Sequence, residues 1–243
     1  MSHPAWPSMA FSTYDWYGDT PASYYACRKA CEPLHIQWNP VAERVEVVNY
    51  SAGAQTGLRA VATLHDLYGA VVSTQETTLD AQEDSTTPLH GIDFSAAGFA
   101  PGDTASAGVC FLRLQLFDGD RLVSLNDYVI PQKEDDLKVL NSLPQVSLKA
   151  SFSWDPATGL FVANVTNPSD APALMIHLSA LDKNGERHLP ALWSDNYFHL
   201  MPGEERTLTL RLSGDAFAYS LRIAGFNVKP LEVSERKHRE VVE

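Results

Sequence analysis

The stretch 109-VCFLRLQLFDGDRLVSLNDYVI-130 decides the fold class of this chain. Every second residue in its first half is apolar, which places four of them on one face of a predicted strand: Cys110, Leu112, Leu114 and Leu116. Arg113 and Gln115 lie on the opposite face. Asp118-Gly119 is typical of a hairpin turn, and residues 121–130 predict the returning strand. The stretch therefore predicts a β-hairpin with one buried face.

Similar short alternating segments precede this hairpin. They are His35–Trp38, 44-RVEVVNY-50, Leu58–Leu67, Val71–Leu79 and Pro88–Phe94, and turns that contain Gly and Ser separate them. About seven short strands in about a hundred residues are typical of an immunoglobulin-like sandwich.

A second alternating series begins at Val146. It continues through 160-LFVANVTN-167, 173-ALMIHLSALD-182, 192-LWSDNYFHLMPGEE-205, 206-RTLTLRL-212 and 219-YSLRIAGFNV-228. The composition of 182–185 predicts a hairpin turn. This series predicts a second sandwich. We therefore expect a mainly β chain with two tandem immunoglobulin-like sandwiches.

The remaining segments set the predicted domain boundaries. Residues 1–33 read as an aromatic coil followed by a short helix, with Thr20 as its N-cap, Pro21 at its first position and Pro33 ending it. Tyr24, Cys27 and Cys31 lie at helical spacing on one face of this helix, and we expect the two cysteines to be packing residues. The first sandwich is expected at 34–132, a charged linker with one helical turn at 133–143, the second sandwich at 144–234 and a charged tail at 235–243.

Charge and composition exclude some classes of partner. Thirty acidic side chains face 18 basic ones, and the net charge of −12 argues against nucleic acid or an anionic membrane. The sequence holds no run of about 18 apolar residues that would span a bilayer, and the N-terminus does not resemble a signal peptide. The three cysteines lack His or Cys partners at ligand spacing, so we expect neither a metal nor a cofactor.

No catalytic constellation is present in the sequence, and we predict no catalytic residue. In 192–205 the pair Asp195 and His199 suggests an acid and a base, but the two lie four residues apart across a turn and a strand. The structural interpretation is stronger: 194–196 turn, Phe198 and Leu200 face one side, and Tyr197 faces the other with His199.

An aromatic cluster marks the N-terminus. Trp6, Tyr14, Trp16 and Tyr17 either stack on sugar rings or pack the helix onto a neighbouring structure, and packing is favoured.

Three segments together resemble glycoside hydrolase family 2. The segment 5-AWPSMAFSTYDWYGDTPASYYACRKACEPLHIQW-38 resembles the end of that family's catalytic (β/α)8 barrel, with a Trp-Pro, a Tyr-Asp-Tyr-like motif and a final helix. The segment 111–128 looks like a strand pair of the family's penultimate sandwich, although Asp127-Tyr128 replaces the usual aromatic ending. Residues 190–210, followed by 224-AGFNV-228, resemble the C-terminal domain of the exo-β-glucosaminidase and β-mannosidase branch.

The resemblance implies that this chain holds the barrel end and the last two sandwiches of a retaining exo-β-glycosidase. Both catalytic glutamates of the family would lie upstream of Trp6, and no Glu precedes Glu32, so we expect the chain to be inert alone. Trp6 is carried over as a substrate-pocket residue. A loop with four named residues is expected to contact the barrel: Trp193, Asp195, Asn196 and Tyr197.

The resemblance also implies the partners. They are the N-terminal domains and barrel of the parent enzyme and its β-linked oligosaccharide substrate, and the parent is expected to be periplasmic or secreted. The alternatives are a free-standing tandem-sandwich module that binds carbohydrate or protein, and an adhesion protein.

Overall fold

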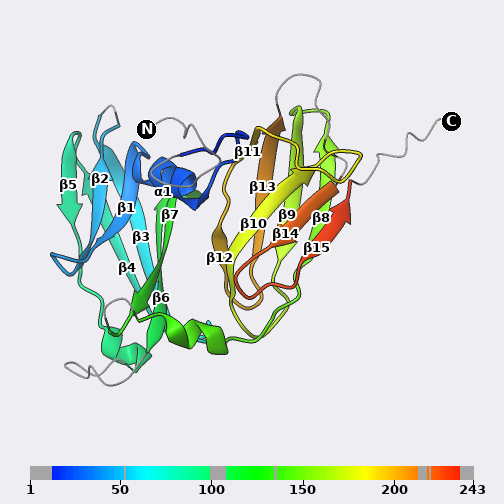
Figure 1. The fold of residues 1–243 in the computed structure, drawn as a ribbon. Helices are drawn as coiled ribbons and strands as arrows, with labels where there is room; N and C mark the ends of the chain where they lie inside the picture. The colour runs from blue at the N-terminus through cyan, green and yellow to red at the C-terminus, as the bar shows by residue number, and fades with distance from the viewer. Residues whose placement is uncertain are drawn as a thin grey trace. The chain divides into compact units, whose positions relative to one another are not determined.

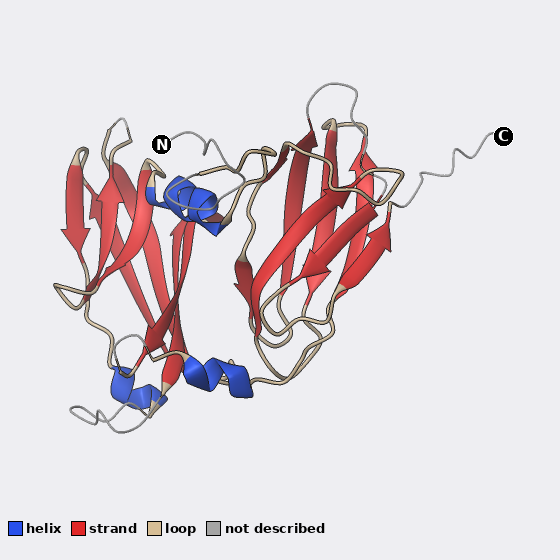
Figure 2. Cartoon of the chain, viewed as in Figure 1, coloured by secondary structure: helices blue, strands red, loops and turns tan. Residues whose placement is uncertain are grey.

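The computed structural model describes residues 13–51, 53–98, 108–133, 136–212, 218 and 220–235. Trp6 and the tail from residue 236 lie outside the described residues. The chain forms two compact units. One is Cys27–Leu143, and the other combines the described residues up to Ala26 with those from Pro144 onward. Antiparallel sheets dominate both units, which confirms the predicted mainly β fold class (Figures 1 and 2).

The unit Cys27–Leu143 contains the first sandwich. Its strands are β1 (Leu34–Asn39), β2 (Arg44–Asn49), β3 (Gln55–His65), β4 (Val71–Ala81), β5 (Ser85–Pro88), β6 (Val109–Asp118) and β7 (Arg121–Pro131). They form two sheets, in the orders β1-β2-β5 and β4-β3-β6-β7. The inner faces of the two sheets build one hydrophobic core, to which β1 contributes Ile36 and β2 contributes Val45 and Val47.

The β6-β7 hairpin confirms the prediction from its alternating pattern. The four residues predicted to face inward are at most 1% exposed: Cys110, Leu112, Leu114 and Leu116. Asp118 pairs with Arg121, so the two-residue loop is Gly119-Asp120. Gly119 has φ 58°, a left-handed conformation that glycine adopts without steric cost.

The strand predicted at 88–94 is wrong. The strand β5 ends at Pro88, and a short 3-10 helix, η1 (Phe94–Ala97), follows. The carboxylate of Asp93 accepts from the Ser95 backbone N–H and caps this helix. Phe94 meets Trp38 edge to face at 5.5 Å between ring centroids. The apolar residues of this segment therefore pack against the sandwich from a loop, where they need no strand alternation.

The other unit contains the second sandwich. Its strands are β8 (Lys149–Asp155), β9 (Leu160–Thr166), β10 (Ala173–Leu181), β11 (Ala191–Trp193), β12 (Phe198–Leu200), β13 (Glu205–Leu212), β14 (Ser220–Ala224) and β15 (Leu231–Ser234). The two sheets have the orders β12-β10-β14-β15 and β11-β13-β9-β8. Phe152 and Phe161 stack at 5.3 Å in the core between them.

The chain segments outside the sandwiches are short. A 3-10 helix, η2 (Lys138–Ser142), occupies the segment for which the sequence predicts one helical turn. The helix α1 (Ala22–Ala30) ends before Pro33, as expected. Its predicted buried face is wrong, because Cys27 and Cys31 are exposed and Tyr25 is the buried residue. The division into domains at residues 33, 132, 143 and 234 stays a prediction.

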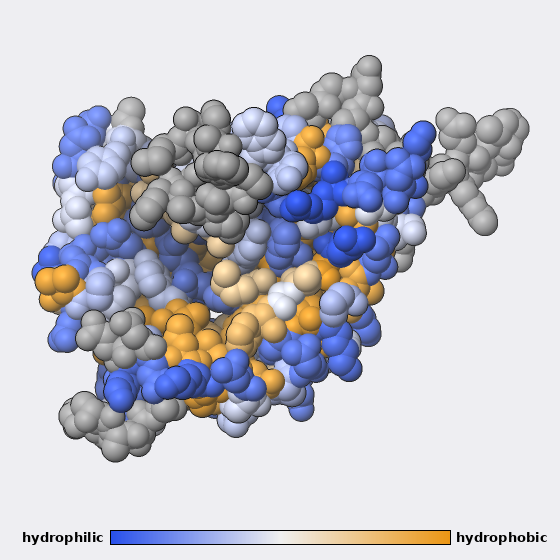
Figure 3. Space-filling view, viewed as in Figure 1, coloured by the Kyte–Doolittle hydropathy of each residue, from blue (hydrophilic) through white to orange (hydrophobic). Residues whose placement is uncertain are grey.

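Hydrophilic residues make up much of the surface in the view of Figure 3. Among the described residues, no helix is long and apolar enough to cross a membrane.

Candidate functional site

The stretch 191–205 passes twice between the sheets of the second sandwich. β11 pairs with β13 in one sheet, residues 194–197 cross over, and β12 pairs with β10 in the other sheet. The turn after β12 then leads to β13, back in the first of these sheets. The turn predicted at 194–196 is therefore the link between two short strands that belong to different sheets. Both ends of the crossing are buried, with Trp193 2% exposed and Phe198 4% exposed.

The side-chain amide of Asn196 fixes residues 194–197 by pairing with the backbone of β10, in place of the backbone groups of a neighbouring strand. Its side-chain Oδ1 accepts from the N–H of Leu178 at 2.8 Å, and its Nδ2 donates to the carbonyl of Leu178 at 3.1 Å. Residue 196 continues the β10-β12 register beyond the pair Ile176 and Phe198. One amide side chain thus satisfies both backbone groups of a buried strand residue, which is costly to leave unpaired.

Asp195 serves the same loop through an ion pair. Its Oδ2 accepts from Nη1 of Arg206 on β13 at 2.8 Å, and its Oδ1 accepts from the N–H of Asn196 at 2.9 Å. The guanidinium carbon of Arg206 also lies 4.7 Å from the centroid of the Phe198 ring. Both members of the pair are about 15% exposed in their side chains, so the contact is largely shielded from solvent.

His199 is oriented away from an acid-base role with Asp195. Its Nδ1 accepts from the backbone N–H of Met175 at 3.0 Å, so the ring is the neutral tautomer with its proton on Nε2. Asp195 is engaged with Arg206, and His199 with β10. The structural interpretation of 192–205 therefore fits the geometry.

The ring of Tyr197 contacts both β10 and α1. Tyr197 adopts φ 57°, which is uncommon for a bulky residue. Its ring stacks on His177 of β10 at 4.6 Å and lies 6.1 Å from the ring of Tyr25 on α1. Burial raises the pKa of Tyr197 to about 12, and the negative charge of Asp19 acts in the same direction.

Tyr25 is the buried anchor of α1 and belongs to the core of the second sandwich. Its hydroxyl lies 3.1 Å from Oγ1 of Thr20 and also interacts with the side chain of Asn196 and the backbone of Trp193. Burial raises the pKa of Tyr25, against the effect of these hydrogen bonds. Three of the four loop residues selected from the sequence thus surround one tyrosine: Trp193, Asn196 and Tyr197.

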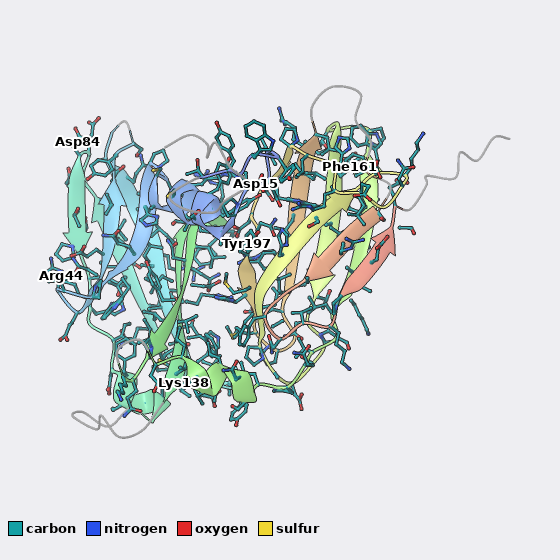
Figure 4. The ribbon with its side chains drawn as sticks, in the orientation of Figure 1. Asp15, Arg44, Asp84, Lys138, Phe161 and Tyr197 are labelled. Carbon is teal, nitrogen blue, oxygen red and sulfur yellow. The ribbon has the colours of Figure 1, made fainter. Side chains whose placement is uncertain are left out.

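The coil before α1 is fixed to the same sandwich. Asp19 forms an ion pair with Arg187, which follows the 182–186 turn after β10. Asp15 closes a tight loop, because its Oδ1 accepts from the N–H groups of Tyr17 at 2.8 Å and Asp19 at 3.0 Å. Figure 4 labels Asp15 and Tyr197, and the charge of Asp15 contributes to the raised pKa of Tyr197.

A small cavity lies where the coil meets the sandwich. Its volume is about 10 Å³, close to that of one water molecule, and its walls include Asp19, Thr20, Arg187 and Trp193. This cavity does not have room for a sugar ring. The arrangement around Tyr25 is therefore an attachment site for a segment of the chain.

Sequence reasoning missed four residues of this attachment site: Asp19, Tyr25, His177 and Arg187. A partial signal existed for His177, which the alternation of β10 places opposite Ile176 and Leu178. Asp19 and Arg187 lie 168 positions apart, and no pattern in the sequence connects them.

A separate cluster in the first sandwich contains Ser, His and Glu. Ser124 donates from Oγ to Oε2 of Glu32 at 2.6 Å, and Nδ1 of His35 lies 3.4 Å from the same oxygen. In a catalytic triad the histidine accepts the proton of the serine. Here Glu32 is the acceptor for Ser124, and Ser124 in turn accepts from the N–H of Ile36 at 3.3 Å. The cluster ties the end of α1 to β1 and β7.

The described residues contain no group of three or more His, Cys, Asp or Glu side chains that is arranged to hold a metal ion.

Comparison with known proteins finds similarity to exo-β-D-glucosaminidases. The model of the exo-β-D-glucosaminidase immunoglobulin-fold domain matches residues 126–228. The exo-β-D-glucosaminidase of Streptomyces avermitilis is 30% identical over 258 residues, which cover 93% of this chain and 28% of that protein. The exo-β-D-glucosaminidase of Amycolatopsis orientalis is 29% identical over 262 residues, and the matched region covers 93% of this chain and 24% of that protein.

Solved structures agree with the sequence relatives. The exo-chitosanase of A. orientalis superposes with a TM-score of 0.77 at 26% identity, over 96% of this chain and 30% of that one. The β-D-mannosidase of Dictyoglomus thermophilum, with a TM-score of 0.67 at 18% identity over 97% of this chain, shares the fold. The chain thus spans about a quarter of the length of the relatives it matches.

Proposed function

We propose that this chain is the non-catalytic C-terminal accessory region of an exo-β-D-glucosaminidase. The premise is that the chain is homologous to a part of these enzymes, which belong to glycoside hydrolase family 2. The parent would be a retaining exo-acting glycosidase for β-linked glucosamine. Within it, the second sandwich would hold the last segment of the catalytic barrel in place. The barrel, the N-terminal domains and the sugar substrate are then the partners of this chain.

The contact of the 193–197 loop with Tyr25 carries this proposal. The family resemblance assigns α1 to the end of the barrel, and the loop surrounds the one buried side chain of that helix. The ion pair between Asp19 and Arg187 fixes the coil that leads into the helix. The second sandwich would thereby support the coil and the helix that follow Trp6 in the sequence. Trp6 is the residue proposed to line the substrate pocket.

The described carboxylates support an accessory role. Glu32 accepts from Ser124, and Asp195 accepts from Arg206. Burial acts to raise the pKa of Glu46, but hydrogen bonds from Asn39, Arg44 and Gln37 and the charge of Arg44 outweigh it and lower the pKa. A glycosidase acid needs the reverse, a raised pKa in an apolar pocket beside a second carboxylate.

The direct test compares the chain alone with the full product of the reading frame that encodes it. The substrate is p-nitrophenyl β-D-glucosaminide, and we expect turnover from the full product and none from the chain. Turnover by the chain that disappears in Glu32→Gln would contradict the proposal. A full product without a barrel would also contradict it, and would favour the free-standing module.

A second test addresses the attachment site in the full product. Tyr197→Ala removes the ring that packs on Tyr25 and His177, and we expect lower thermal stability and a lower kcat. Tyr68→Ala is the matched control, because Tyr68 is 56% exposed in the first sandwich. Equal effects of the two substitutions would show that the loop has no special role.

A further inference from the structure

The loop Tyr14–Gly18 presents aromatic rings on a fixed backbone. Trp16 is 60% exposed and Tyr17 is 59% exposed, while Tyr14 is 36% exposed. Among the four described tryptophans, Trp16 is the exposed one: the others are Trp38, Trp154 and Trp193. An aromatic side chain ordinarily buries 150–250 Å² and dominates a core or an interface. The packing that the sequence favours is thus not found for Trp16 and Tyr17 within the described residues, and the sugar-stacking alternative is the one developed for these two rings.

Hydrogen bonds within the loop hold these rings in position. Besides the two bonds to its carboxylate, the backbone N–H of Asp15 donates to the carbonyl of Asp19 at 2.9 Å, and that of Gly18 donates to Asp15 at 3.1 Å. Gly18 adopts φ 83°, in the region that favours glycine. The loop is joined to the sandwich through Asp19 and Arg187. Such preorganisation reduces the entropic cost of binding.

The surroundings of the rings favour a cationic ligand. The acidic residue Asp15 lines the same hollow as the rings, and the faces of Trp and Tyr attract ammonium groups. An open hollow of about 350 Å³ lies beside the loop, and its described walls are Tyr14, Asp15, Trp16, Tyr17 and Gly18. This space admits a sugar ring, in contrast to the cavity of about 10 Å³ beside Thr20.

We propose that this aromatic loop is a stacking platform for glucosamine oligomers with free amino groups. The C–H face of a sugar ring would lie on Trp16, and an ammonium group would lie over Trp16 or Tyr17. The inference rests on the proposed function, which supplies the amino sugar as the substrate class. It adds a binding site on this chain, separate from the attachment site around Tyr25.

Binding to the 243-residue chain tests the platform without any turnover. The ¹⁵N-labelled chain is titrated with a glucosamine hexamer, and the indole N–H signal of Trp16 is assigned by its loss in Trp16→Ala. We expect this signal to shift on titration. Trp16→Ala and Tyr17→Ala should each weaken binding about fivefold, the effect of one exposed cation–π contact of about 1 kcal/mol. Trp16→Phe should lie between Trp16→Ala and the unchanged chain.

Two controls make the result specific. Tyr50→Ala removes a ring that is 69% exposed in the first sandwich and should leave binding unchanged. The N-acetylated hexamer has the same rings without the positive charges and should bind at least about twofold more weakly.

The proposal is overturned if the Trp16 signal does not respond, if Trp16→Ala and Tyr17→Ala bind like the unchanged chain, or if both hexamers bind equally. Any of these results would leave the accessory role standing, since that role is tested by turnover. If the full product has no glucosaminidase activity while the 243-residue chain still binds the glucosamine hexamer, the proposed function is overturned instead.

Discussion

The imidazole of His177 lies face to face with the ring of Tyr197, with 4.6 Å between the ring centroids and 16° between the ring planes. Burial lowers the pKa of His177; the nearby charge of Asp19 acts against this effect, and that of Arg187 acts with it. The stacked pair therefore favours the neutral imidazole.

This pair predicts acid sensitivity of the second sandwich. An unfolded histidine titrates near pH 6.5, so below that pH the unfolded chain binds a proton that the folded chain binds only at lower pH. The free energy of unfolding should thus fall as the pH decreases from about 7 to 5. His177→Phe keeps a stacked ring without a proton site, and urea unfolding at both pH values should show a smaller fall. An equal fall in both proteins would contradict this assignment.

The ion pair between Asp19 and Arg187 predicts local opening of the coil before α1. Its side chains are 23% and 45% exposed, so Asp19→Asn should cost only roughly 0.5–1 kcal/mol of global stability. Amide hydrogen exchange in residues 15–25 should nevertheless become faster, because the coil loses its charged anchor. Glu76→Gln breaks the exposed pair with Arg59 in the first sandwich and serves as the control. Unchanged exchange in Asp19→Asn would show that Tyr25 alone holds the coil.

Removal of the Ser124 hydroxyl is expected to lower the stability of the first sandwich. Ser124 is 2% exposed, donates to Glu32 and accepts from the N–H of Ile36. Ser124→Ala leaves that N–H buried without its acceptor, so we expect a loss of about 1–3 kcal/mol in the free energy of unfolding. Denaturant unfolding monitors the loss. A catalytic reading of the cluster predicts an effect on turnover instead, with stability unchanged.

The ion pair between Asp127 and Arg113 is expected to make the stability of the first sandwich depend strongly on both residues being present. Asp127 accepts two hydrogen bonds from Arg113, at 2.7 and 3.2 Å, and the two side chains are 15% and 10% exposed. Asp127→Ala would leave Arg113 shielded and without this partner, at a cost of about 3 kcal/mol. The double change of Asp127→Phe with Arg113→Leu should recover most of the loss. Thermal unfolding of both variants is the measurement. Recovery in the double variant shows that the loss in Asp127→Ala comes from the charge of Arg113 without this partner, and no recovery shows that it comes from packing.

The strands could be predicted where one face of a sheet is buried and a turn fixes the register. The alternation of 109–130 and the Asp118-Gly119 turn were sufficient for the β6-β7 hairpin, since a shift of one residue would expose Leu112 and Leu114. The prediction at 88–94 failed because backbone pairing with β2 continues only to Leu89 and His90, through two hydrogen bonds with Val45, and the apolar residues beyond them pack from a loop. Alternation alone does not distinguish the two cases.

The candidate site depends on contacts that the sequence does not encode locally. The crossing at 194–197 requires knowledge of which sheet each flanking strand joins, and β11 and β12 are only three residues long each. The buried face of α1 was misassigned because Tyr24 and Tyr25 are adjacent, and the surface that selects Tyr25 includes Tyr197. The motif resemblance selected residues 193–197 for a contact with the barrel, which stays a prediction, and it did not reveal the contacts of this loop with Tyr25.

The place of Tyr25 in the core of the second sandwich has a consequence during synthesis. Tyr25 and Tyr197 are 172 positions apart, so at 5–20 residues per second the ribosome needs roughly 10 to 30 s to travel from one to the other. Throughout that interval α1 exists without the sandwich that buries its tyrosine. The first sandwich is complete in sequence by Leu143 and can fold in the meantime. The second sandwich acquires its full core only after its own last strands emerge and bury Tyr25, which was synthesised before both sandwiches.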